Sequence, residues 1–167
     1  MGQEASKRGV LSMDLEVEQL GGVLVIAINR PAQRNSITRA VSLAVADALD
    51  RLDEDDALHV GILTGRGGYF CAGMDLKAFA RGEDIGPLGT FVRNGCNKPL
   101  IAAIEGFAIA GGCEIALTCD LFVASKGAKI GIREVKVGLF AAAGGVFRLP
   151  ARVGYATAMQ MAITGEP

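Results

Sequence analysis

The stretch IAAIEGFAIAGGCEIALTCDL, at residues 101–121, decides the fold that we expect for this chain. An apolar strand over Leu100–Ile104 leads into this stretch, and small residues then continue to Gly111-Gly112. A helix then runs to about Cys119, with Glu114 in its first turn, and 121–124 returns to strand. A strand, a small-residue turn, a helix and a second strand predict a layered α/β unit.

Similar units lie on the N-terminal side. The alternating segment 14–20, the pair Gly21-Gly22 and the apolar run 23–28 predict a β-hairpin. Thr38 is a suitable N-cap for a half-buried helix, and 60–64 is typical of a short buried strand. The whole pattern favours an α/β fold.

The domain organisation follows from the same pattern. Residues 1–13 are polar and lack periodicity, so we expect a flexible leader, and 14–167 is expected to form one core domain. Within that domain the glycine-rich segment 78–97 predicts a mobile loop that leads into a helix.

Composition excludes several classes of function. The 167 residues are 50% hydrophobic, which is enough for a core, and 17 basic residues balance 18 acidic ones. We therefore expect no nucleic-acid and no membrane partner. His59 is the only histidine, so a zinc site with two histidines cannot form within one chain. The four cysteines form no C-x-x-C pair, and a cytoplasmic protein with reduced thiols is expected.

Two glycine-rich segments are the candidates for a catalytic role. The first is 70–76, directly after a buried strand and its turn, and the second is 106–114, where a strand gives way to a helix. Backbone N–H groups from two such turns could bind a developing oxyanion. Each segment alone also fits a structural explanation, because small residues allow close helix–strand packing and Glu114 complements a helix dipole.

Taken together, the motifs resemble the crotonase (enoyl-CoA hydratase/isomerase) superfamily. The resemblance rests on the Asn29-Arg30-Pro31 segment with Asn35, the 63–65 turn, the 70–76 segment and the long 101–121 stretch, in the family's order. It covers about residues 15–167. It implies a spiral of ββα units and a homotrimer or dimer of trimers. It also implies further C-terminal helices, so we expect a C-terminally shortened version of this fold.

The resemblance also implies roles for individual residues. Met74 and Gly111 match the positions whose backbone N–H groups form an oxyanion hole. Glu114 and Glu134 match the two catalytic glutamates of hydratases.

The remaining matches concern the acyl-CoA substrate. Ala72 matches the residue whose backbone contacts the CoA adenine, and Gly73, Asp75 and Leu76 belong to the same CoA-side loop. Arg34 is a candidate phosphate contact or, equally, a solvated surface arginine.

One position departs from the family pattern. Arg133 stands where relatives carry proline before the second glutamate, which loosens the turn and adds a charge beside a carboxylate.

Two glutamates favour an enoyl-CoA hydratase-like lyase, which adds water across the α,β double bond of an enoyl-CoA thioester or removes it. Two carboxyl groups can divide the acid and base roles, and no metal or redox cofactor is required because CoA is part of the substrate. The alternatives are another crotonase reaction, such as carnitinyl-CoA dehydration or enoyl-CoA isomerisation, and an inactive acyl-CoA-binding or interaction remnant.

Overall fold

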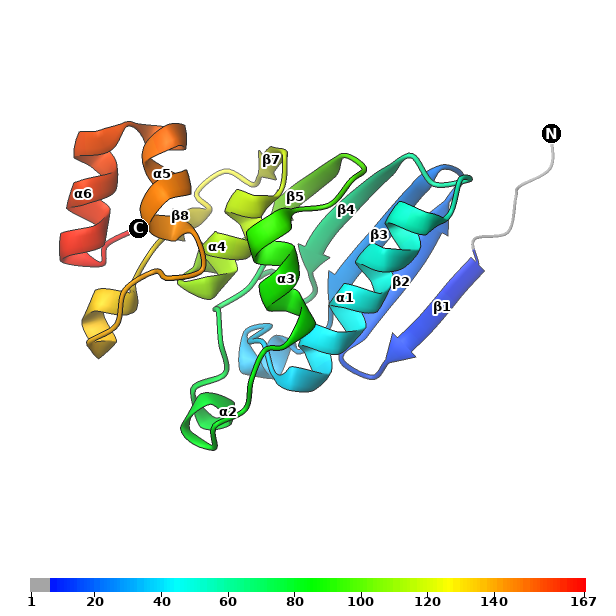
Figure 1. Cartoon of the computed structure of the whole chain (residues 1–167), viewed down its shortest axis with the longest axis horizontal. Helices are drawn as coiled ribbons and strands as arrows, with labels where there is room; N and C mark the ends of the chain where they lie inside the picture. The colour runs from blue at the N-terminus through cyan, green and yellow to red at the C-terminus, as the bar shows by residue number, and fades with distance from the viewer. Residues whose placement is uncertain (1–6) are drawn as a thin grey trace.

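The main sheet runs across the molecule (Figure 1). The computed structural model describes residues 7–167, with side chains from Met13 onward. The sheet has the order β1-β2-β3-β4-β5-β7. The bounds are Lys7–Ser12 for β1, Leu15–Leu20 for β2, Val23–Ile28 for β3, Val60–Gly65 for β4, Leu100–Ile104 for β5 and Leu121–Ala124 for β7. Strands β1 to β3 pair antiparallel, whereas β3, β4, β5 and β7 are parallel. The predicted hairpin and strands are confirmed.

The flexible leader predicted for residues 1–13 is wrong for 7–12. These residues form β1, in which Gly9 pairs with Val17 of β2. The outer edge of β2 presents N–H and C=O groups that can pair with any extended backbone, so strand formation here needs no apolar alternation. Residues 1–6 lie outside the described part of the chain.

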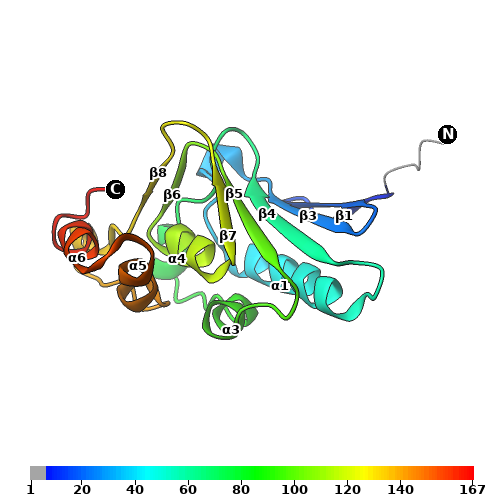
Figure 2. The same ribbon diagram turned by 90° about the horizontal axis from the view of Figure 1, so that it is seen from above.

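A second, smaller sheet confirms the expected spiral of ββα units. It contains β6 (Phe107–Ile109) and β8 (Lys129–Gly131), which are parallel, and Cys71 forms a bridge to Ala108 of β6. The chain therefore passes from the main sheet to the small sheet three times. It runs from β4 to the bridge at Cys71, from β5 to β6, and from β7 to β8. Figure 2 shows β6 and β8 beside the main sheet.

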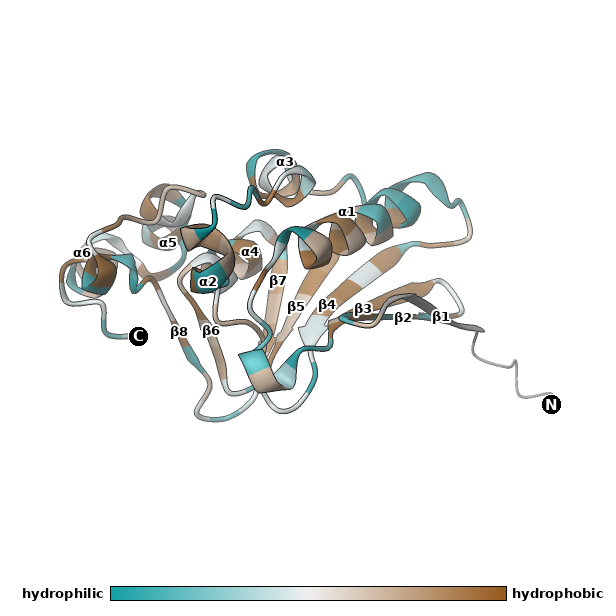
Figure 3. Cartoon of the chain, turned by 90° about the horizontal axis from the view of Figure 1, so that it is seen from below, coloured by the Kyte–Doolittle hydropathy of each residue, from teal (hydrophilic) through white to brown (hydrophobic). Residues whose placement is uncertain are grey.

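The helices lie toward one side of the molecule: α1 and α3 lie along one face of the main sheet, whereas α5 and α6 lie beyond the sheet, next to α4 (Figures 2 and 3). Their bounds are Arg39–Glu54 for α1, Leu76–Ala80 for α2, Pro87–Asn94 for α3, Gly111–Thr118 for α4, Gly145–Val153 for α5 and Tyr155–Thr164 for α6, with short 3₁₀ turns η1 at Pro31–Gln33 and η2 at Glu134–Val137. Thr38 caps α1 as predicted, because its side chain accepts a hydrogen bond from the Val41 N–H. Segment 78–97 contains the expected helix, α3, after a stretch without helix at 81–86, but it begins with the end of α2, which was not expected.

Two groups of buried side chains meet at α4. The larger lies between the main sheet and α1 and includes Ile26, Leu49 and Leu63. The smaller joins α4 to α5 and α6 through side chains such as Leu117 and Leu149. Figure 3 shows the hydrophobic side of α1 turned toward the sheet. Helix α4 is therefore held from both sides, which fixes the direction of its N-terminus.

Candidate active site

A cavity of about 540 Å³ opens beside the N-terminus of α4. Residues from four segments line it, namely 72–76, 109–115, 133–143 and part of α3, together with Ile37 and Ile85. Most of the lining is apolar, and the charged side chains in it are Glu114, Glu134, Arg133 and Lys136. An apolar cavity with a few convergent polar groups is the usual form of a small-molecule site.

The two glycine-rich segments approach each other at this cavity. A Cβ atom placed on Gly73 would lie 2.9 Å from the amide nitrogen of Gly111, and a Cβ on Gly111 would lie 3.6 Å from the amide nitrogen of Met74. Within residues 7–167, neither the Met74 N–H nor the Gly111 N–H donates a hydrogen bond to another group. Two backbone donors without partners therefore converge at one place in the cavity wall.

Pairing with a distant segment sets the direction of the Met74 N–H. The Ile37 N–H donates to the Gly73 carbonyl oxygen over 2.8 Å, and the Asp75 N–H donates to the Ile37 carbonyl oxygen over 2.9 Å. In a trans peptide the carbonyl and the N–H point in opposite directions. Because Ile37 holds the Gly73 carbonyl, the Met74 N–H of the same peptide points away from Ile37, on the side where Gly111 lies.

The Gly111 N–H is directed by an unusual backbone conformation at the preceding residue. Ala110 has φ 51° and ψ −131°, a region that residues with a side chain rarely adopt. Its N–H donates to the Gly131 carbonyl oxygen of β8 over 2.9 Å, which holds the turn in this conformation. The strained turn starts α4 and leaves the Gly111 N–H at the helix N-terminus, where such groups lack a helical partner.

Glu114 is a buried carboxyl group in the first turn of α4. Only 4% of the residue is exposed, and its Oε1 accepts a hydrogen bond from the Gly145 N–H of α5 over 3.0 Å. The pKa of Glu114 is raised to about 7; burial is the largest cause, the Gly145 N–H acts against the shift, and the charge of Glu134 adds to it. At neutral pH this group exists in both protonation states.

Glu134, at the start of η2, is half-buried and faces the same cavity. Its Oε2 is buried and has no hydrogen-bond partner among the described residues. Burial raises the pKa of Glu134. A buried polar atom without a partner is rare in folded proteins and is a natural position for a substrate or water contact. The two glutamates influence each other's ionisation, as an acid–base pair requires.

The structure places the other candidate residues as follows. Ala72 and Leu76 line the cavity beside Met74, and Gly73 lies directly against the Gly111 backbone. Arg34 has an exposed side chain that does not line the cavity, and its carbonyl oxygen accepts a hydrogen bond from the Ala72 N–H over 3.1 Å.

Asp75 does not line the cavity either. Its carboxylate accepts hydrogen bonds within the protein, from the Ser36 hydroxyl and from the N–H groups of Lys77 and Ala78. These hydrogen bonds, of which the Ala78 one has the largest effect, together with the Arg30 charge lower the pKa of Asp75.

Three residues that support the site have little or no signal in the sequence. Ile37 and Gly145 contribute backbone groups, which any residue carries, and they come from positions far from their partners in the chain. Ala110 is an ordinary small residue whose φ cannot be inferred from its type. Only Gly144-Gly145 in the sequence hints at a tight approach of α5 to Glu114.

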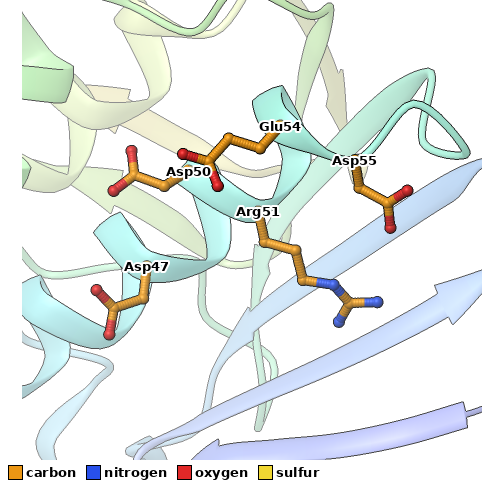
Figure 4. Close-up of a pocket in the computed structure, with 5 residues that line it drawn as sticks. All are labelled: Asp47, Asp50, Arg51, Glu54 and Asp55. Carbon is orange, nitrogen blue, oxygen red and sulfur yellow. The ribbon is translucent and has the colours of Figure 1, made fainter.

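A second hollow, on the outer side of α1, has a different character. Asp47, Asp50, Arg51, Glu54 and Asp55 line it. Figure 4 shows the Arg51 side chain extended away from Asp47 and Asp50, and its Nη2 donates to Gln19 Oε1 over 2.6 Å. Within residues 7–167 no three His, Cys, Asp or Glu side chains are grouped so that they could hold a metal ion. This hollow is a charged, solvated helix face.

The described residues also contain no helix that is long and apolar enough to cross a membrane.

Comparisons with known proteins agree with the geometry. A family model described as "Enoyl-CoA hydratase/isomerase" matches residues 18–167. The chain is 40% identical over 168 residues to the enoyl-CoA hydratase EchA19 of Mycobacterium tuberculosis, a match that covers 92% of this chain and 62% of the relative.

Solved structures are similar as well. The chain superposes on the enoyl-CoA hydratase EchA1 of Mycobacterium marinum with a TM-score of 0.87 and 54% identity, over 93% of this chain and 63% of the other. For a carnitinyl-CoA dehydratase of Mycobacterium avium 104, the TM-score is 0.87 and the identity 45%, over 93% and 64%. The chain thus spans less than two thirds of the length of these relatives. Because the family model matches nearly the whole chain, and fold and motifs agree with it, this chain belongs to the enoyl-CoA hydratase/isomerase family within the crotonase superfamily.

Proposed function

We propose that this chain hydrates the α,β double bond of an enoyl-CoA thioester, or catalyses the reverse dehydration. The observation that carries the proposal is the convergence of two unpartnered N–H groups, from Met74 and Gly111, in a cavity that also holds Glu114 and Glu134. The membership of the family supports it.

The two N–H groups would bind the thioester carbonyl oxygen. When the oxygen atom of water bonds to Cβ, the π electrons of the double bond move toward Cα and the carbonyl, and an enolate oxyanion forms. Two fixed donors bind this oxyanion more strongly than the neutral carbonyl, which lowers the barrier. The enolate then takes a proton at Cα, and the carbonyl re-forms.

The two glutamates would transfer the protons. One carboxylate takes a proton from the attacking water, and the other carboxyl group gives a proton to Cα, so the pair keeps its total charge over the reaction. Burial raises the pKa of both groups, and that of Glu114 reaches about 7, so a pair with one proton is accessible at neutral pH. No cofactor takes part in these steps, since CoA belongs to the substrate.

The CoA portion would lie along the 72–76 loop. Ala72, Gly73, Asp75 and Leu76 form this loop, and the Ala72 carbonyl oxygen accepts no hydrogen bond within the described residues. Arg34 lies next to it in space, because its carbonyl accepts from Ala72. Its exposed guanidinium would meet a CoA phosphate at the surface.

The proposal extends to assembly and location. We place the chain in the cytoplasm, as a homotrimer or dimer of trimers. Large apolar side chains on α5 and α6 are exposed, among them Phe147, Tyr155 and Ile163, and such surfaces usually become covered by association. Sedimentation velocity of the purified chain would measure the number of subunits.

The central test is hydration of crotonyl-CoA and of longer enoyl-CoA esters by the purified chain, followed as loss of the conjugated absorbance. We expect turnover with at least one of these esters. If the folded chain binds CoA esters without turnover, it is a binding protein; if it binds none, only a structural role remains.

A Glu134→Gln variant tests the acid–base assignment. We expect kcat to fall by about 10²–10⁴-fold, the usual contribution of such a group, while the affinity for the CoA ester remains. Glu54→Gln, in the hollow on α1, is the matched control, because it removes an equal charge at an exposed position away from the cavity. An unchanged rate in the Glu134→Gln variant would exclude the assigned role.

A second candidate reaction has specific support. The carnitinyl-CoA dehydratase of Mycobacterium avium 104 is 45% identical to this chain, so dehydration of a carnitinyl-CoA ester is the alternative. Product analysis with a panel of crotonyl-CoA, carnitinyl-CoA and a β,γ-enoyl-CoA distinguishes hydration, this dehydration and isomerisation.

A further inference from the structure

We propose that Asp75 is a positioning residue for the oxyanion hole, acting together with Ser36 and Arg30. These three side chains, called the clamp below, hold segment 34–37 against segment 72–75. They thereby fix the orientation of the peptide between Gly73 and Met74, which carries the Met74 N–H. This inference rests on the proposed function, since it assigns support for the same two-donor site.

The carboxylate of Asp75 has two separate sets of contacts. Its Oδ1 accepts from the N–H groups of Lys77 and Ala78, over 3.0 and 3.1 Å, and so caps α2. Its Oδ2 lies 3.2 Å from the Ser36 hydroxyl and 3.6 Å from Arg30 Nη1. One oxygen therefore serves the local helix, and the other reaches a segment 39 residues away in the chain.

Arg30 completes the clamp by contacts with Ser36 and Asp75. Its Nη1 donates to the Ser36 carbonyl oxygen over 2.6 Å and lies 3.3 Å from the Ser36 hydroxyl. Only 12% of the Arg30 side chain is exposed, and its Nε also forms an ion pair with Asp14 over 3.4 Å. A buried guanidinium with several acceptors holds its partners in defined positions, because each lost contact would leave a desolvated charge.

The clamp acts on the reacting region through one peptide. Ser36 immediately precedes Ile37, whose N–H binds the Gly73 carbonyl, and Asp75 immediately follows Met74. If Ile37 moves, the peptide between Gly73 and Met74 can rotate, and the Met74 N–H turns away from Gly111. The carboxylate thus controls a donor that it does not touch, which explains its contacts better than capping of the five-residue helix α2 alone.

Asn35 anchors the same segment at its other end. It is fully buried, its Oδ1 accepts from the Arg30 N–H over 2.8 Å, and its Nδ2 donates to the carbonyl oxygens of Arg66 and Tyr69. Segment 34–37 is therefore fixed on one side by Asn35 and on the cavity side by the clamp. The Asp75 end is the one that can be loosened without removing the buried anchor.

The test uses Asp75→Asn and Ser36→Ala, with Asp53→Asn as the matched control. Asparagine still caps a helix, so Asp75→Asn removes the ion pair and retains α2. Asp53 is a similar carboxylate that joins distant segments, since it accepts from the N–H groups of Asn97 and Lys98 about 3.0 Å away, but the segments that it joins are not 34–37 and 72–75. Each protein is assayed for crotonyl-CoA hydration and for thermal stability.

The decisive readout is the absorbance of a bound 4-(dimethylamino)cinnamoyl-CoA, a chromophore whose band moves to longer wavelength when its thioester carbonyl is polarised. We expect a red shift in the parent chain, a reduced shift in both clamp variants and an unchanged shift in Asp53→Asn. We also expect kcat to fall by about tenfold in Asp75→Asn with little change in KM, a fraction of the 10²–10³-fold loss when a whole donor is removed.

The outcomes separate the two proposals. No shift in the parent chain refutes the two-donor site and with it the proposed function. A full shift in the parent chain and in folded Asp75→Asn refutes the clamp and leaves the function intact. If Asp75→Asn does not fold, Ser36→Ala decides in the same way, because it removes one hydroxyl contact and no charge.

Discussion

The two segments that deliver an N–H group to the cavity do so by different physical means. Segment 72–75 is positioned by hydrogen bonds to a segment nearly forty residues earlier, with the Asp75 carboxylate closing the contact. Segment 110–114 is positioned mainly by the strained φ of Ala110 and by α4 itself, with one hydrogen bond to a distant segment, from the Ala110 N–H to the Gly131 carbonyl oxygen. It also carries the buried Glu114.

This difference shows that the positions of the two N–H donors depend on different kinds of contact. A backbone held by long-range contacts is sensitive to changes at remote positions, whereas a strained turn at a helix start depends on the residues within it and on the packing of that helix. The three predictions below act where the two segments touch, then on the carboxyl group of the second segment, and last on its strained turn.

The largest effect is expected from Gly73→Ala, where the segments touch. Gly73 has φ +90°, and a Cβ there would lie 2.9 Å from the Gly111 nitrogen and 3.2 Å from the Ala110 Cβ. The added methyl group must push the two donors apart, so we expect kcat to fall about 100-fold or more. Steady-state hydration of an enoyl-CoA ester measures this.

The control for this substitution is Gly127→Ala. Gly127 has φ +83°, and an added Cβ would meet nothing within 4 Å. This variant therefore shares the backbone strain and lacks the collision, so its stability should fall by about 1 kcal/mol while kcat stays the same. Equal kcat losses in the two variants would contradict the predicted contact between the donors.

An effect on stability is expected next, from Glu114→Gln. The pKa of Glu114 is about 7 in the folded chain against an ordinary 4.5, so the folded state favours the protonated carboxyl group. This contribution to stability is complete below pH 4.5 and is lost as the pH rises through 7, by about 3 kcal/mol in all. Glutamine cannot ionise, so the variant should be more stable than the parent at pH 8 and similar to it near pH 4.

Urea denaturation of both proteins across this pH range measures the difference. The same variant should hydrate the substrate more slowly, since it removes one member of the acid–base pair. Parallel pH profiles of the unfolding free energy would show that the pKa of Glu114 is the same in the folded and the unfolded chain, despite its burial.

The smallest effect is expected from Ala110→Gly, within the strained turn. Glycine adopts φ 51° and ψ −131° without a steric penalty, which offsets its larger loss of chain entropy. We expect the free energy of unfolding to rise by about 1 kcal/mol and kcat to fall about two- to threefold, because the freer turn directs the Gly111 N–H less strictly. Urea denaturation and steady-state kinetics test both, and a lower stability would show that Ala110 is not strained.

Much of the fold could be predicted from local sequence. The 23–28 strand, the Thr38 cap and the 101–121 unit follow from apolar periodicity and capping chemistry, which depend on neighbours in the chain. Strand β1 was missed because its pairing uses backbone groups, which carry no sequence signal. The helix expected within 78–97 is α3, which Gly86 and Pro87 start, whereas the end of α2 at 78–80 was not predicted.

The candidate site, too, could be predicted only in part from the sequence. Its residue types were visible in the sequence: glycines at 73 and 111 where backbones approach, and carboxyl groups at 114 and 134. The sequence alone also determined the fold class and the family, because these follow from short motifs in a fixed order. Tertiary structure decided that the Met74 and Gly111 N–H groups converge without hydrogen-bond partners among residues 7–167, that the Ser36 hydroxyl contacts Asp75, and that the Gly145 N–H contacts Glu114. The physical reason is that the direction of a hydrogen bond and the desolvation of a carboxyl group depend on segments brought together only by folding.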